Sequence, residues 1–150
     1  MDEVGVWIRK AEVAELITRY AALTDAGEWE ALAALYTEDG RMNRPMAPDD
    51  FIAGRGEILK AFRARPPRSA RHVVANVLVR LENDARASAT SQLLLFTAQA
   101  SGTDSLPVQS AQPPLIGCYH DKLLNTEQGW RFQERRGSLD FSAPAPRVEP

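Results

Sequence analysis

The chain has 150 residues, of which 44% are hydrophobic and 25% charged, a composition typical of a single globular domain. Its 18 basic and 20 acidic residues leave a net charge of −2, which argues against nucleic acid as a partner. One cysteine cannot form an internal disulfide, the longest strictly apolar run (residues 93–96) is far too short to cross a membrane, and the acidic amino terminus lacks the features of a secretory signal, so we expect a soluble, cytoplasmic protein.

The first predicted element is an amphipathic helix that ends at Gly27, where a left-handed stop is available. Charged residues lie off its apolar stripe, as a solvated face requires. The stripe itself recurs at spacings of three and four and consists of Val13, Leu16, Ile17, Tyr20, Ala21 and Thr24. A second helix is predicted over residues 28–36, followed by a turn at residues 37–40.

Residues 44–53 contain two prolines and two acids, and the composition predicts a loop. A short third helix over residues 54–64 follows, with Phe62 on its buried side, and it ends before Pro66-Pro67.

The rest of the chain is strand-like. The pattern predicts one hairpin from residues 72–81 and 85–100, and a second from residues 115–125 and 130–141. Residues 101–114 are expected to form a flexible loop between them. Helices first and antiparallel strands after predict an α+β domain over residues 1–141, with residues 142–150 as a flexible tail.

Two polar residues at the ends of predicted elements are candidates for chemistry. Asp25 lies at the margin of the apolar stripe and is either a solvated helix-end acid or part of a site. His72 opens the first long strand, where alternation places His72, Val74, Asn76 and Leu78 on one face. It is either a satisfied core residue or a general base, because an ordinary pKa of about 6.5 lets it exchange protons near neutral pH.

A third candidate lies in the penultimate strand, where alternation puts Tyr119 and Asp121 on one face and Cys118 and His120 on the other. Tyr119 either packs as an aromatic residue or donates a proton to a developing negative charge. Clusters with metal-ligand spacing, glycine-rich phosphate loops and nucleophile elbows do not occur in the sequence. We therefore expect no metal and no cofactor.

Seven short motifs occur in a familiar order between residues 8 and 141. They are YAALTDAGEW (20–29), YTEDG (36–40), GRGEI (54–58), RHVVAN (71–76), GCYHD (117–121), GWR (129–131) and ERR (134–136). The ordered set resembles the SnoaL-like proteins of the NTF2-like superfamily. This resemblance implies a cone in which three amino-terminal helices pack on a strongly curved, mostly antiparallel sheet and enclose an apolar pocket. Scytalone dehydratase, steroid isomerases and polyketide cyclases are cofactor-free enzymes of this superfamily, whereas dioxygenase small subunits and transport factors share the fold without catalysis.

The nearest catalytic pattern is that of scytalone dehydratase, in which an aspartate orients a histidine. The resemblance assigns these roles to Asp25 and His72. Two tyrosines that hold a water in that enzyme correspond to Thr24 and Arg44, and its second histidine has no counterpart. An asparagine of the closing hairpin corresponds to Tyr119. The aspartate–histidine pair is therefore present in this sequence, whereas the residues around it differ from those of scytalone dehydratase.

The leading hypothesis is a cofactor-free dehydratase or isomerase in which Asp25 orients His72, His72 moves a proton and Tyr119 steadies the enolate. The expected partner is a small apolar, aromatic or polyketide-like ligand. Its remaining contacts are predicted to be Tyr20, Met42, Phe51, Phe62, Val74, Asn76 and Leu95. Two alternatives stay open, a non-catalytic carrier and a structural subunit that binds another protein. We also expect a homodimer, partly because residues 73–79 are apolar on both strand faces.

Overall fold

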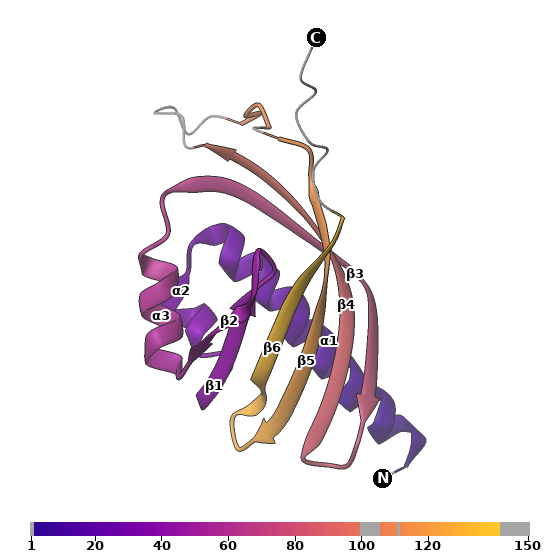
Figure 1. Cartoon of the computed structure of the whole chain (residues 1–150). Coiled ribbons are helices and arrows are strands. Elements are labelled where there is room, and N and C mark those ends of the chain that lie inside the picture. The colour runs from indigo at the N-terminus through magenta and orange to yellow at the C-terminus, as the bar shows by residue number, and fades with distance from the viewer. Residues whose placement is uncertain (1, 100–105, 111, 142–150) are drawn as a thin grey trace.

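Three helices and six strands make up the part of the chain that this computed structural model describes, residues 2–99, 106–110 and 112–141 (Figure 1). In chain order they are α1 (Glu3–Ala26), α2 (Trp29–Ala33), β1 (Tyr36–Arg44), β2 (Ala47–Ala53), α3 (Arg55–Arg63), β3 (Arg68–Leu81), β4 (Arg86–Gln99), β5 (Leu115–Thr126) and β6 (Gly129–Phe141). The six strands form one sheet in the order β2-β1-β6-β5-β4-β3.

The sheet is mostly antiparallel, and β1 and β6 are its parallel pair. The predicted α+β class and both predicted hairpins, β3–β4 and β5–β6, are thereby confirmed. Strong curvature of the sheet stays a prediction. The expected tail at residues 142–150 lies outside the described residues, as does most of the first half of the expected 101–114 loop. No helix in the described ranges is both long and apolar enough to span a membrane.

The core lies between α1, which crosses one face of the sheet (Figure 1), and that sheet. Tyr20 is one of its buried residues. The buried residues of α1 are the predicted stripe from Val13 to Thr24. The helix ends as predicted, because Gly27 has a φ of 71° and its backbone N–H donates to Thr24. The ring of Tyr20 makes edge contacts with the rings of Tyr36, Phe62, Tyr119 and Phe132.

The segment after α1 differs from the prediction. The second helix is only the short α2, and the predicted turn at residues 37–40 and loop at residues 44–53 are largely the strands β1 and β2. The strand β1 pairs with β6, about ninety residues later, and its pairing with β2 shifts register. Just after β2, the backbone N–H of Gly54 donates to the carbonyl of Gly40 at 2.7 Å. Long-range pairing of this kind overrides the local turn preference of the residues involved.

The predicted strand over residues 72–81 forms, but it begins at Arg68, so His72 lies within β3 and does not open it. The alternation of buried and exposed side chains also reverses partway along the strand. Asn76 has a φ of 50°, a left-handed conformation that asparagine tolerates, and the pairing with β4 shifts register between Ala75 and Leu78. After this bulge Val77 packs against the core, while Asn76 and Leu78 are exposed. The expectation that Asn76 and Leu78 lie on the face of His72 is therefore wrong.

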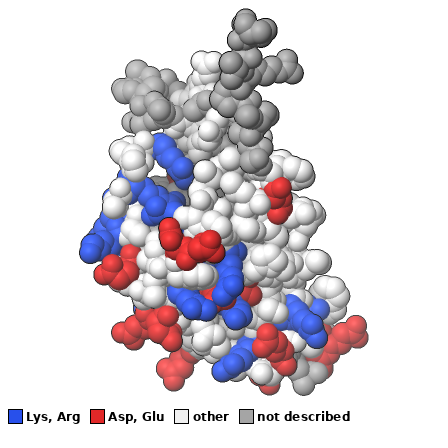
Figure 2. Space-filling model, viewed as in Figure 1, with Lys and Arg blue, Asp and Glu red and all other residues white. Residues whose placement is uncertain are grey.

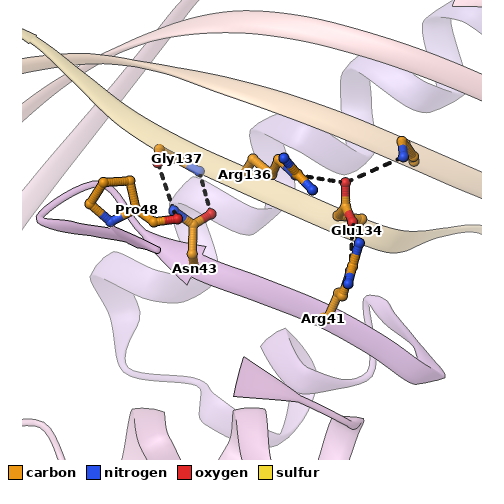
Figure 3. A network of polar contacts seen from close by, with 7 residues as sticks. Arg41, Asn43, Pro48, Glu134, Arg136 and Gly137 are labelled. Atoms are coloured by element: carbon orange, nitrogen blue, oxygen red, sulfur yellow. Dashed lines mark hydrogen bonds and ion pairs between the residues drawn. The ribbon is translucent and has the colours of Figure 1, made fainter. Parts of the chain in front are cut away.

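Two polar clusters join β1 to β6 (Figure 3). In the first, the buried amide of Asn43 donates to the carbonyls of Gly137 at 2.8 Å and Pro48 at 3.1 Å, and it accepts from the N–H of Gly137 at 2.9 Å. A Cβ on Gly137 would lie 2.7 Å from Pro45, so this close approach requires glycine. The pairing of β1 with β2 shifts register at Asn43. There the Asn43 side chain, instead of the β1 backbone, makes the hydrogen bonds to β6.

In the second cluster, Glu134 of β6 accepts hydrogen bonds from Arg41 and Arg136 (Figure 3). It also forms an ion pair with Lys122 of β5. Burial alone would raise the pKa of Glu134, but the hydrogen bonds from Arg41 and Arg136 hold it below its ordinary value. The cluster therefore links β1, β5 and β6 through their side chains.

We expect Asn43→Ala to lower the free energy of unfolding by about 1–3 kcal/mol, because it leaves buried backbone groups of Gly137 without partners. Urea denaturation measures the change. Asn125→Ala is the matched control, since the Asn125 amide makes one exposed hydrogen bond, to Asp84. Equal losses in the two variants would contradict the assigned role of Asn43.

Candidate active site

A cavity of about 510 Å³ is lined by α1, the end of β1 and the α3–β3 connection. The beginnings of β3 and β5 and the ends of β4 and β6 complete its walls. This volume lies within the range of roughly 300–1,000 Å³ that is usual for small-molecule sites. Five of the predicted site residues line it: Tyr20, Met42, His72, Leu95 and Tyr119. Side chains from both ends of the chain therefore meet around one space.

Asp25 and His72 form a hydrogen-bonded pair at the wall of this cavity. The last turn of α1 carries Asp25, and β3 carries His72, 47 residues later. Carboxylate Oδ1 of Asp25 lies 2.5 Å from Nδ1 of His72, and Oδ2 accepts the backbone N–H of His72 at 2.9 Å. The two side chains are only 11% and 6% exposed. Two bonds to one residue fix both the carboxylate and the imidazole.

The hydrogen bond at Nδ1 determines the tautomer of His72. Because a carboxylate accepts there, we assign the ring proton to Nδ1, which leaves the lone pair on Nε2. His72 lines the cavity, so Nε2 is the nitrogen available to a ligand. An imidazole held in this way can accept a proton at Nε2 while Asp25 stabilises the positive charge that forms.

Burial lowers the pKa of His72 below its ordinary value, and the positive charges of Arg68 and Arg65 lower it further. The hydrogen bond and charge of Asp25 oppose this shift without cancelling it. The imidazole is therefore neutral near pH 7, the form that a general base needs.

Tyr119 shares the buried face of β5 with Asp121, as predicted for the pair, and its ring packs against that of Tyr20. Burial raises the pKa of Tyr119 well above its ordinary value, and the nearby Tyr20 adds to the effect. The phenol therefore keeps its proton at neutral pH. A protonated hydroxyl at the cavity wall can donate a hydrogen bond to an oxygen of a ligand.

The structure places the other four predicted ligand contacts outside the set of described residues that line the cavity. Phe62 belongs to the core, and Val74 packs against that core. Phe51 lies on the edge strand β2, where the guanidinium groups of Arg41 and Arg136 are 4.9 and 5.1 Å from its ring centroid. Asn76 lies in the β3 bulge and donates to Gln92 on the exposed side of the hairpin.

A buried ion pair that was not predicted from the sequence lies directly behind the cavity. Arg135 of β6 and Asp121 of β5 are both completely buried and form two parallel hydrogen bonds of 2.7 and 2.8 Å. The guanidinium carbon lies 4.2 Å from the ring centroids of Tyr20, Tyr119 and Phe132. The pair therefore supports the two tyrosines of the cavity from behind. Strand alternation had placed Asp121 beside Tyr119, and a buried acid at that position signals a hidden cation.

Three basic residues of the cavity were not predicted as ligand contacts, Arg44, Arg65 and Arg68. The resemblance gives Arg44 only as the counterpart of a tyrosine. All three line the cavity. The sequence signal for Arg65 and Arg68 is the Pro66-Pro67 pair, a rigid spacer that lies between them.

The profile of the SnoaL-like domain family matches residues 8–136. The chain belongs to this family. The predicted resemblance is thereby confirmed. A sequence search of curated proteins finds no match to the chain. Within the described residues, no group of three or more His, Cys, Asp or Glu side chains is arranged to hold a metal ion.

Solved structures similar to this SnoaL-like protein share its fold. An NTF2-like protein with a cystatin-like fold from Novosphingobium aromaticivorans is 26% identical, with a TM-score of 0.73 and coverage of 93% of this chain and 88% of that chain. A protein of the same organism, described as a proposed scytalone dehydratase, is 20% identical, with a TM-score of 0.75 and coverage of 95% and 97%. A protein from Catenulispora acidiphila, solved in complex with S-DNPA, is 21% identical, with a TM-score of 0.69 and coverage of 92% and 96%.

Proposed function

We propose that this SnoaL-like protein is a cofactor-free lyase or isomerase that acts on a small cyclic, aromatic or polyketide-like compound by proton transfer. The observation that carries the proposal is the pairing of Asp25 with His72 at the wall of a ligand-sized cavity. A carboxylate that fixes one imidazole nitrogen and leaves the other toward a cavity is an arrangement for general acid–base chemistry.

The proposed reaction begins with removal of a proton. Nε2 of His72 takes the proton from a carbon next to a carbonyl, and the electron pair of the broken C–H bond moves to the carbonyl oxygen as an enolate. The hydroxyl of Tyr119 donates a hydrogen bond to that oxygen. His72 then gives its proton to another carbon, completing an isomerisation, or to a leaving hydroxyl, which departs as water. Such a positioned base typically contributes about 10²–10⁴-fold to a rate.

Two similar proteins support this choice of ligand and reaction. One is described as a proposed scytalone dehydratase, and another was solved with S-DNPA bound. The cavity of this chain also offers the apolar walls that a ring requires, including Met42, Leu93 and Leu95.

A second candidate function is that of a carrier that binds the same ligands without converting them. The residues that replace the water-holding tyrosines of scytalone dehydratase favour it. The hydroxyl of Thr24 donates to the carbonyl of Tyr20 at 2.7 Å and is therefore occupied within the helix. Arg44 provides a cation instead of a phenol.

We expect a screen of cyclic ketones and β-hydroxy ketones to yield turnover without added metal or cofactor. The rate should rise with pH and level off below neutrality, because His72 must be unprotonated and its pKa lies below the ordinary value of about 6.5. Stopped-assay chromatography across a pH series measures it. Ligand binding without conversion at every pH would establish the carrier instead.

The outer face of the sheet is proposed to form a homodimer. Val73 and Phe96 are 49% and 41% exposed and lie diagonally across the β3–β4 pair on that face. Exposed apolar groups that lie together are typical of association surfaces. In sedimentation experiments we expect the wild type to be a dimer at micromolar concentration and Phe96→Asp to be a monomer, with Val4→Asp on α1 as the control. A monomeric wild type of 16.6 kDa would contradict the proposal.

A further inference from the structure

The cavity that contains His72 has a strongly one-sided charge. Three arginines line it, Arg44 at the end of β1, Arg65 after α3 and Arg68 at the start of β3. In the described part of the chain no aspartate or glutamate lines the cavity. Figure 2 shows Lys and Arg side chains gathered at the upper left of the molecule, over the region where α3 passes into β3.

The three arginines have few partners of their own. Arg44 Nη2 donates to the carbonyl of Ala61 at 3.2 Å, but its Nε is buried with no hydrogen-bond partner among the described residues. Arg65 is half-buried and its guanidinium carbon lies 4.0 Å from the ring centroid of Phe62. Arg68 is exposed at the rim. None of the three forms an ion pair within the described ranges, although other arginines do: Arg19, Arg41, Arg63, Arg135 and Arg136.

Like charges so close together repel one another. Burial lowers the pKa of Arg65, and the charges of Arg44 and Arg68 lower it further, so the guanidinium groups act on one another across the cavity. The Pro66-Pro67 spacer restricts the backbone between Arg65 and Arg68 and prevents the two residues from separating freely. An anion bound between them would remove the repulsion and pair with guanidinium donors already held in place.

We propose that this cavity selects an anionic ligand, a ring compound with a carboxylate group, and that Arg65 and Arg68 bind the carboxylate with Arg44 beneath it. The apolar walls at Leu93 and Leu95 then contact the ring, next to His72. This inference rests on the proposed function for what happens to the ligand, but the anion preference itself requires only binding.

The test compares 2-naphthoate with 2-naphthamide, which share one ring system and differ in charge. For the wild type, we expect calorimetry or fluorescence to show that the carboxylate binds about tenfold or more tightly than the amide. Arg65→Gln and Arg68→Gln should each reduce this ratio severalfold or more and leave the affinity for the amide unchanged. Arg71→Gln is the matched control, because Arg71 is exposed on the other face of β3 and does not line the cavity.

Salt provides a second measurement on the same proteins. Added sodium chloride should weaken naphthoate binding to the wild type, because it screens the guanidinium charges, and should leave naphthamide binding unchanged. Arg68 is exposed, so Arg68→Gln decides the question if Arg65→Gln fails to fold. Equal affinities of the two probes in the wild type, or equal losses for both probes in Arg68→Gln, would overturn the proposal.

The outcome is separable from that of the proposed function. Asp25→Asn should keep the preference for naphthoate, since Asp25 does not line the cavity. A wild type that prefers the carboxylate but converts no ring compound would refute the enzyme and retain the anion site. A wild type that converts neutral ketones and binds both probes equally would do the reverse.

Discussion

Asp25→Asn is expected to lower the turnover of any substrate by about 10²–10⁴-fold while the protein remains folded and binds ligand. The amide is nearly isosteric with the carboxylate, but it does not carry the charge that stabilises a protonated His72. Steady-state kinetics on the wild type and the variant measures the effect, with the loss in kcat and little change in KM. Asp49→Asn, on the exposed edge strand β2, is the control.

The same reasoning predicts how Asp25 and His72 combine. His72→Ala should cost about as much as Asp25→Asn, and the double variant should cost little more than either, because residues that act as a unit are not additive. Losses that multiply in the double variant would show that the two residues act independently. A structural helix-end role of Asp25 would instead change stability by about 0.5–2 kcal/mol and leave turnover intact.

The second large effect is expected at the buried ion pair. Asp121→Asn should lower the free energy of unfolding by about 3–5 kcal/mol, because it leaves the charge of Arg135 uncompensated in a site with no exposure. In the wild type Asp121 raises the pKa of Arg135 against the effect of burial. In the variant that support is gone, but the ordinary pKa of an arginine lies so far above neutrality that the guanidinium stays charged. Urea denaturation measures the loss.

Two further variants make the second prediction specific to a buried charge. Asp121→Leu combined with Arg135→Met removes both charges and should recover much of the stability, since apolar replacement of a buried pair is often neutral. Glu15→Gln breaks the exposed pair with Arg19 and should have little effect. A loss at Asp121→Asn no greater than that at Glu15→Gln would contradict the account.

Local patterns in the sequence predicted the parts of the fold that depend on near neighbours. The apolar spacing from Val13 to Thr24 and the stop at Gly27 depend only on residues within one helix, and they predicted α1 correctly. The strand β1 was missed because its parallel partner β6 is about ninety residues away in the chain. No local pattern carries that information, and residues 37–40 (TEDG) taken alone predict a turn.

For the candidate site as well, residues in local motifs were predicted, whereas residues whose position depends on distant contacts were not. Asp25 and His72 were predicted as site residues because each lies in a motif that resembles the family, and the structure brings them into hydrogen-bond contact. Asn76 was misplaced because one bulged residue reverses the alternation of a strand, and the bulge is visible only in the pairing with β4. The cavity arginines were missed because they come from two segments, the end of β1 and the α3–β3 connection, that meet only in the folded chain.

The central claim, that Asp25 acts on His72, is tested most directly by NMR titration of the imidazole in the wild type and in Asp25→Asn. The chain has two histidines, and His120, exposed on the other face of β5, provides the reference signal. We expect the His72 midpoint of the wild type to lie below the ordinary value of about 6.5 and that of the variant to lie lower still, since the charge that favoured the imidazolium has been removed. An unchanged His72 midpoint would contradict the assignment of Asp25 and His72 as a catalytic pair.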